Sequence, residues 1–143
     1  MRYWLLLGLF AFPQPIVVAQ THVTHGEVKA FIQQLEQSFN QQDITSYGNN
    51  LSEQFKVIVQ LSPNDQITFD RRDFLSLVAT GFKDNPSLTT KYALTKITNA
   101  GSATIVEGSS TETDGKETVR GRWRINLTKQ GSQIVITQME LFQ

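Results

Sequence analysis

The stretch DGKETVRGRWRINLTKQGSQIVITQMELF, residues 114–142, decides the fold class of this chain. Apolar and polar residues alternate along much of it, and glycine turns stand at Asp114-Gly115 and Gln130-Gly131. An Asp-Gly pair between alternating residues is typical of a β-hairpin, because glycine adopts the backbone conformations that tight turns need. The stretch therefore predicts consecutive antiparallel strands.

The same alternation extends upstream to Thr89 and is divided by a further turn at Ala100-Gly101. It predicts a meander of strands over residues 89–99, 102–113, 116–129 and 132–142. An earlier strand is indicated at Phe55–Leu61, where every second residue is apolar, and a short one at Ile67–Phe69.

Before these strands the apolar spacing is helical. In residues 26–41 the apolar stripe consists of Val28, Ile32, Leu35 and Phe39, with glutamines on the opposite face.

Two aspartates mark further helix starts. Asp43 can cap a short second helix through Tyr47. Asp70, three residues before Asp73, opens a third helix that carries Phe74 and Phe82. Helices followed by a meander indicate an α+β fold.

Hairpin registers assign the strand residues to two faces. A two-residue loop at Asp114-Gly115 would pair Thr113 with Lys116 and place Val106 opposite Trp123. The more apolar face, expected to lie against the helices, comprises Ala93, Thr95, Ile97, Val106, Gly121, Trp123, Ile125, Leu127, Ile134, Ile136, Gln138, Glu140 and Phe142. The outward face comprises Tyr92, Leu94, Lys96, Ile105, Glu107, Arg120, Arg122, Arg124, Val135, Thr137, Met139 and Leu141.

Composition excludes several classes of function. Lys plus Arg and Asp plus Glu number 13 each, which gives a net charge of zero and argues against a nucleic-acid partner. We interpret the alternating Arg120, Arg122 and Arg124 as part of a solvated face. The absence of cysteine excludes disulfides, thiolate metal sites and thiol nucleophiles.

The first residues have the pattern of a secretory signal peptide. Arg2 precedes the apolar run Tyr3–Phe12, prolines interrupt the sequence after it, and Ala19 offers a small residue before a cut. The run is too short for a membrane anchor, which needs about 20 apolar residues. The sequence therefore predicts a signal peptide at 1–19, a disordered tail at 20–25 and one domain at 26–143, in a periplasmic or secreted protein that has no membrane attachment after cleavage.

The sequences AFIQQLEQSFNQQDI, LSEQFKVIV, ITFDRRDFLSLVATGF and IVITQMELF follow one another as helix, strand, helix and final strand. In this order they resemble the nuclear transport factor 2-like, or SnoaL-like, superfamily. The resemblance implies a cystatin-like α+β cone, in which a curved antiparallel sheet wraps around N-terminal helices and encloses an internal pocket. Members include ketosteroid isomerases, polyketide cyclases, dehydratases and non-catalytic binding domains, so the resemblance implies a fold rather than a function.

The catalytic residues of these members do not carry over. In ketosteroid isomerase-like members a tyrosine, an aspartate base and a protonated acid act together. The resemblance places these positions near Leu35, Val59 and Trp123, which are apolar here. Dehydratase-like members use a His–Asp pair, but His22 and His25 both precede the first helix. We therefore predict no catalytic residue, cofactor or metal site.

A mostly apolar pocket with a few polar groups remains the expected site. Gln138 and Glu140 interrupt the inward face of the last strand and supply those polar groups. The predicted ligand-binding residues are Leu35, Val59, Trp123, Ile125, Ile136, Gln138, Glu140 and Phe142.

Three hypotheses follow. The first is an exported, non-catalytic domain that binds a small apolar ligand or serves as an accessory subunit. The second is an isomerase, cyclase or lyase that uses Glu140 as acid or base. The third is a homodimer that forms through the outward face, where Tyr92, Leu94, Met139 and Leu141 would lie beside the arginines.

Overall fold

The computed structural model describes residues 22–143, and the predicted signal peptide at 1–19 lies outside them. Helix α2 (His25–Asn40) begins at a capping box. The Thr24 hydroxyl accepts a hydrogen bond from the Glu27 N–H at 3.2 Å, and the Glu27 carboxylate accepts one from the Thr24 N–H at 3.1 Å. Val23, just before the cap, is only 1% exposed. The disordered tail predicted over residues 20–25 therefore does not include residues 23–25.

Two aspartates begin the other helices, as predicted. The Asp43 carboxylate accepts hydrogen bonds from the N–H and hydroxyl of Ser46 at 3.1 and 2.7 Å, where α3 (Ile44–Gly48) starts. These bonds favour the ionised form and lower the pKa of Asp43. Asp70 accepts the Asp73 N–H at 2.8 Å, where α4 (Arg71–Asp84) starts. Caps of this kind stabilise a helix by about 1 kcal/mol.

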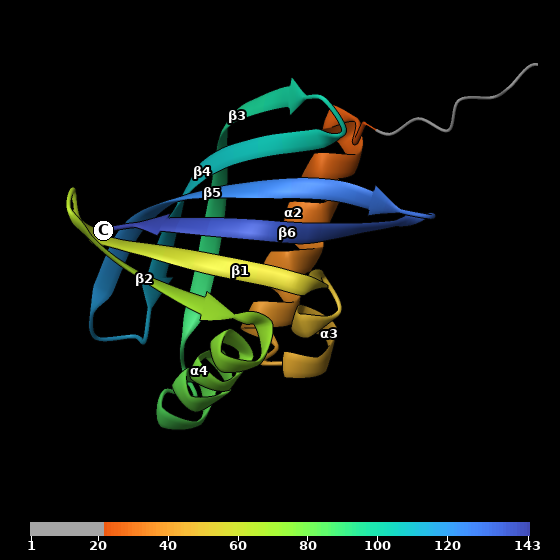
Figure 1. The fold of residues 1–143 in the computed structure, drawn as a ribbon. Coiled ribbons are helices and arrows are strands. Elements are labelled where there is room, and N and C mark those ends of the chain that lie inside the picture. Colours follow the sequence, from red (N-terminus) through yellow and green to blue (C-terminus); the bar gives the residue numbers. More distant parts are fainter. Residues whose placement is uncertain (1–21) are drawn as a thin grey trace, which may run out of the picture.

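Six strands form one curved sheet in the order β2-β1-β6-β5-β4-β3. The strands are β1 (Leu51–Ser62), β2 (Asp65–Asp70), β3 (Thr89–Ala100), β4 (Ala103–Thr113), β5 (Thr118–Gln130) and β6 (Gln133–Phe142). Strands β3 to β6 form the predicted antiparallel meander, and β1 and β2 form an antiparallel hairpin. Figure 1 shows the sheet bent around α2, with α4 below its edge. The α+β cone is thus confirmed.

The sheet is mixed rather than purely antiparallel. β1 lies beside the last strand, β6, and runs parallel to it, with Val57 paired to Met139. Chain distance explains the arrangement, because the helix α4 and the whole meander separate β1 from β6 and let the chain return in the same direction. The sequence pattern indicated the strands but carried no signal for this long-range pairing.

The core lies between the concave face of the sheet and the helices. Its fully buried side chains come from the segment just before α2 and from α2, β1, β4, β5 and β6, and include Val28, Phe55, Val106, Leu127 and Ile136. Burying a side chain of this size stabilises the fold by about 1.5–3 kcal/mol relative to leaving it in water.

The β4–β5 turn is longer than predicted. Thr113 pairs with Thr118, so the loop spans residues 114–117. The Asp114 carboxylate holds this loop by accepting the N–H groups of Lys116 and Glu117, each at 2.8 Å.

The longer loop shifts the β4–β5 register by two residues, so that Val106 lies opposite Ile125 and Gly108 opposite Trp123. This two-residue shift leaves the side chains of β4 and β5 on their predicted faces, because side chains in a strand alternate with a period of two.

Candidate ligand-binding pocket

A cavity of about 270 Å³ lies between the helices and the concave face of the sheet. Its lining comes from α2, α3, α4 and strands β3 to β6. The lining residues are the aromatic Phe39, Tyr47, Phe74, Tyr92 and Trp123, the aliphatic and small Ile32, Leu35, Leu77, Val78, Gly81, Leu88, Ile125, Met139 and Leu141, and the polar Ser110 and Glu112. The cavity is therefore mostly apolar, as ligand-binding pockets generally are.

The helical stripe of α2 supplies one wall. Ile32, Leu35 and Phe39 follow one another at spacings of three and four residues, so all three face the cavity. Phe39 also packs edge-on against Phe82 of α4 with ring centroids 4.9 Å apart, and against Tyr47 at 6.0 Å. Such edge-to-face contacts stabilise the wall beyond the burial of area alone.

The floor of the cavity depends on Gly108. A Cβ atom at this position would lie 2.3 Å from Cζ2 of Trp123 and 2.4 Å from the carbonyl oxygen of Ala93. Glycine thus lets the indole ring of Trp123 lie across β4, where it contacts Tyr92 edge-on with centroids 5.9 Å apart. Within the described chain the buried Nε1 of Trp123 has no hydrogen-bond partner.

Polar groups gather at one end of the cavity. On β3 and β4, Thr90 pairs with Glu112 and Tyr92 pairs with Ser110, which places all four side chains on the concave face. Tyr47 of α3 lies near enough that the Glu112 charge raises its pKa.

Burial shifts the pKa values of the titratable side chains at this end of the cavity. It raises the pKa of the Glu112 carboxyl, because the apolar surroundings disfavour its charged form. It also raises the pKa of Tyr47 and of Tyr92, and the neighbouring Glu112 charge adds to both shifts. Both phenols are therefore neutral donors at physiological pH.

Hydrogen bonds from α2 fix this end of the cavity in place. The side-chain amide of Asn40 accepts the Thr90 N–H at 2.7 Å and donates to the Thr90 carbonyl at 3.0 Å, as a neighbouring strand would. The Glu36 carboxylate accepts the Tyr92 N–H at 2.8 Å. The start of β3 is thus tied to the last turns of α2.

Of the predicted ligand-binding residues, Leu35, Trp123 and Ile125 line the cavity. Ile136 is fully buried in the core and Val59 packs against the core, but neither lines the cavity.

The prediction that Gln138, Glu140 and Phe142 point inward is wrong. Ile136 pairs with Leu127, but Gln138 pairs with Asn126, so Thr137 is an additional residue in a β-bulge. A bulge changes which residues face the core, because one extra residue reverses the alternation beyond it.

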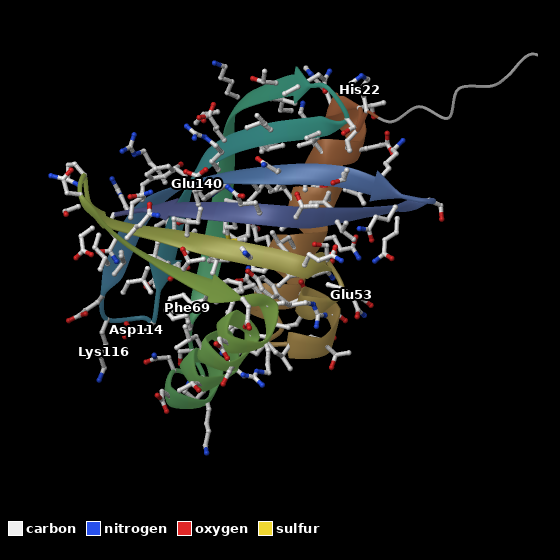
Figure 2. The ribbon with its side chains drawn as sticks, in the orientation of Figure 1. His22, Glu53, Phe69, Asp114, Lys116 and Glu140 are labelled. Atoms are coloured by element: carbon white, nitrogen blue, oxygen red, sulfur yellow. The ribbon has the colours of Figure 1, made fainter. Side chains whose placement is uncertain are left out.

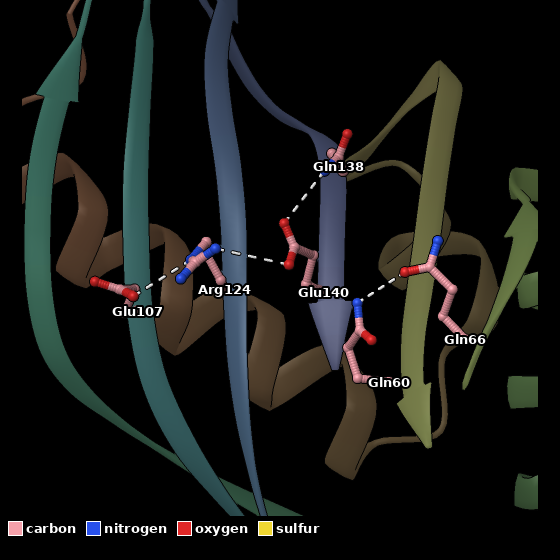
Figure 3. A network of polar contacts seen from close by, with 6 residues as sticks. All are labelled: Gln60, Gln66, Glu107, Arg124, Gln138 and Glu140. Atoms are coloured by element: carbon pink, nitrogen blue, oxygen red, sulfur yellow. Dashed lines mark hydrogen bonds and ion pairs between the residues drawn. The ribbon is translucent and has the colours of Figure 1, made fainter. Parts of the chain in front are cut away.

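Glu140 lies instead in a polar network on the convex face of the sheet. Figure 3 shows this network in front of the strands, with the helices behind them. The Arg124 guanidinium is 3.6 Å from Glu140 and 3.3 Å from Glu107, and Gln138 donates to Glu140 at 3.4 Å. Phe142 lies beneath the guanidinium groups of Arg122 and Arg124, each 5.7 Å from the ring centroid.

Met139 and Leu141 were predicted to face outward, but because of the same bulge they face inward and line the cavity. On β3 a second bulge, at Thr95, does the same for Tyr92 and Leu94. Ala93 and Thr95, predicted to face inward, are exposed.

Local sequence patterns marked both bulges. The apolar residues Leu94 and Ile97 are three positions apart rather than two, and so are Ile136 and Met139. The polar residues at the cavity end were missed for another reason, since Tyr47 and Glu112 come from elements that no short-range pattern brings together.

Within residues 22–143, no group of His, Cys, Asp and Glu side chains is arranged to hold a metal ion. None of the helices in this range is long and apolar enough to cross a membrane.

This chain is similar to known proteins in its structure but not in its sequence. No protein-family model matches the sequence, and no curated protein sequence matches it either. A solved NTF2-like protein of unknown function from Shewanella oneidensis superposes with a TM-score of 0.69 at 18% identity, over 81% of this chain and 96% of that one. A domain of unknown function with a cystatin-like fold from Nostoc punctiforme gives 0.67 at 13%, over 84% and 78%.

The β subunit of the benzoate 1,2-dioxygenase from Burkholderia mallei has a TM-score of 0.68 at 10% identity, over 85% of this chain and 91% of that subunit. At sequence identities this low, the similarity shows a shared fold and not a shared function, because proteins with one fold can have many unrelated functions. This chain therefore has the cystatin-like fold of the nuclear transport factor 2-like proteins.

Proposed function

We propose that this protein is an exported domain that binds a small, mostly apolar molecule in the cavity between α2, α4 and the sheet. The observation that carries the proposal is the cavity itself, whose apolar and aromatic lining surrounds one polar end. Its volume of about 270 Å³ is close to the lower end of the range for small-molecule sites, about 300–1,000 Å³. A ligand there would be compact.

Export is supported by the sequence alone. Arg2 and the apolar run Tyr3–Phe12, with Ala19 before the expected cut, have the pattern that secretion machineries recognise. We expect the amino terminus of the secreted or periplasmic product to lie at or near Gln20.

The enzyme hypothesis based on Glu140 has little support. Glu140 lies on the convex face, paired with Arg124, and so cannot meet a molecule in the cavity. The homodimer hypothesis also loses its basis, because the apolar Tyr92, Met139 and Leu141 that were to form the contact line the cavity.

Tryptophan emission offers a direct test of binding. The chain has two tryptophans, so a Trp4→Phe background leaves Trp123, in the cavity wall, as the reporter. We expect cyclohexylmethanol, which is neutral and transparent in the near ultraviolet, to change the Trp123 emission in a saturable way.

A cavity-filling variant separates this site from nonspecific binding. Val78→Phe adds volume to the α4 wall and should abolish the saturable change, whereas Ser76→Phe, at an exposed position of α4, should not. The binding proposal fails if Val78→Phe and Ser76→Phe titrate alike, or if no neutral apolar compound of this size perturbs Trp123.

A further inference from the structure

The charge of the cavity lining is negative. Among the described lining residues Glu112 is the one charged side chain, and the rest are apolar, aromatic or neutral polar. No Lys or Arg residue is among these described lining residues. Arg71 donates to the Gly48 carbonyl at 2.9 Å, and Lys116 is an exposed residue of the β4–β5 turn in Figure 2.

Glu112 is also without a partner in the part of the chain that the structure describes. No ion pair and no side-chain hydrogen bond involves it, in contrast to Glu107 and Glu140 on the other face. Burial is the cause of its raised pKa, with no basic group offsetting that effect. A partly buried carboxylate of this kind is stabilised by a ligand that brings a positive charge.

Thr90 lies next to this end of the cavity, although it does not line the cavity itself. It is only 3% exposed, and its side chain lies close enough to the Tyr92 phenol to offset part of the rise that burial causes in the pKa of that phenol. Thr90 is the ladder partner of Glu112, so its hydroxyl and the carboxylate stand on the same face of neighbouring strands. The carboxylate, which does line the cavity, can accept the hydrogen bonds that an ammonium group donates.

Aromatic rings surround the same end. The Glu112 charge is close enough to Tyr47 and Tyr92 to raise the pKa of both phenols. Trp123 contacts Tyr92 edge-on. The faces of such rings carry negative potential and attract organic cations.

We propose that the ligand of this cavity is a lipophilic amine, whose ammonium group lies beside Glu112, Tyr47 and Tyr92 while its carbon skeleton packs among Leu35, Ile125 and Met139. This inference rests on the proposed function, because it names the chemical class of the molecule that the cavity binds. It also excludes carboxylates such as short fatty acids, since their charge would be brought next to Glu112 in an environment of low dielectric constant.

Three compounds that share one ring test the inference. Cyclohexylmethylamine, cyclohexylmethanol and cyclohexanecarboxylate have similar carbon skeletons and differ in charge. We expect the amine to bind at least about tenfold more tightly than the alcohol, and the carboxylate to bind more weakly than the alcohol. Titrations follow Trp123 emission in the Trp4→Phe background at neutral pH.

Variants assign the preference to Glu112. Glu112→Gln retains the shape of the side chain and removes its charge, so it should lower the amine affinity about tenfold and leave the alcohol within about twofold. Glu140→Gln removes a charge from the convex face and should change neither affinity. Thermal unfolding of each variant confirms that it is folded.

The outcomes separate the two proposals. Saturable binding of the alcohol without a preference for the amine would leave the binding function standing and overturn the amine inference. An amine preference that survives Glu112→Gln would also overturn it. If no compound of the three binds, both proposals fall.

Discussion

The two faces of the sheet place glutamates in opposite surroundings. On the convex face Glu140 is paired with Arg124, which also contacts Glu107, and water reaches all three. On the concave face Glu112 is partly buried, has no ion-pair partner within residues 22–143, and stands beside two tyrosines. The charges on the convex face are paired and reached by water, whereas Glu112 on the concave face has neither an ion-pair partner within residues 22–143 nor full access to water.

Neighbours in the sequence therefore lie on opposite faces of this sheet, and their residue types alone do not decide which face each one takes. Glu140 stands between Met139 and Leu141, and those two residues line the cavity while Glu140 faces solvent. The β-bulge at Thr137 decides which of these neighbours faces inward.

The largest expected effect comes from placing a charge at residue 139, which lies on the cavity side of the bulge. Met139→Glu would put an unpaired charge into the buried lining, where Met139 is 6% exposed. We expect it to lower the free energy of unfolding by about 3–5 kcal/mol, the usual cost of an uncompensated buried charge. Urea denaturation measures the loss.

The matched control is the neighbouring residue. Glu140→Met removes one partly exposed ion pair and should change stability by less than about 1 kcal/mol. Equal effects at residues 139 and 140 would show that the assignment of faces around Thr137 is incorrect.

A smaller effect should follow from crowding the cavity floor. Gly108→Ala places a Cβ atom 2.3 Å from Cζ2 of Trp123 and 2.4 Å from a backbone oxygen, so the indole ring must move. We expect a loss of about 1–3 kcal/mol, together with a shift of Trp123 emission.

Gly26→Ala serves as the control, because Gly26 is in α2 and nothing lies within 4 Å of its added Cβ. It should be neutral or stabilise the protein by up to about 1 kcal/mol. Chemical denaturation monitored by circular dichroism compares the two. If Gly108→Ala proves as stable as Gly26→Ala, the close packing of Trp123 on β4 is disproved.

On the convex face the effect should be smaller still. Glu140→Gln removes the 3.6 Å ion pair with Arg124, whose side chain is 41% exposed. We expect a loss of less than about 1 kcal/mol at low salt, decreasing further at 1 M salt because exposed charges are screened. A large loss that salt does not reduce would mean that this network is not solvated.

The smallest effect concerns Glu112 and depends on pH. Its folded-state pKa is raised, so the folded chain keeps this proton to a higher pH than the unfolded chain does. The stability of the wild type should therefore fall relative to Glu112→Gln as pH rises above the unfolded pKa, and the difference should level off above the folded pKa.

Below the unfolded pKa the two proteins should be equally stable. The lowered pKa values of Asp43 and Asp114 affect both proteins alike and cancel in the difference. Thermal unfolding over an acid-to-neutral series measures it, and a wild type that gains stability over the variant with rising pH would contradict the burial of Glu112.

Much of the fold could be predicted from local patterns. The stripe Val28, Ile32, Leu35 and Phe39 gave the position of the long helix, because residues three and four apart share one face of a helix. Asp43 and Asp70 marked helix starts because their carboxylates satisfy backbone N–H groups that have no other partner. Glycine turns separated the strands of the meander.

The candidate site was predicted only in part. Leu35, Trp123 and Ile125 line the cavity as expected, but the polar end of the last strand was assigned to the wrong face. The error came from continuing a strict alternation past Thr137. A local reading of Met139, Glu140 and Leu141 would have placed Glu140 outside.

The sequence by itself determined the order and type of the elements, their caps and the apolar character of the interior, because these depend on interactions between residues close in the chain. Only the tertiary structure decided the parallel pairing of β1 with β6, the bulges at Thr95 and Thr137, and the meeting of Tyr47, Tyr92 and Glu112. Each of these depends on how a curved sheet closes around a helix. In such a sheet one extra residue in a strand moves every side chain beyond it to the opposite face. The amino-acid composition of the strand gives no sign of this change.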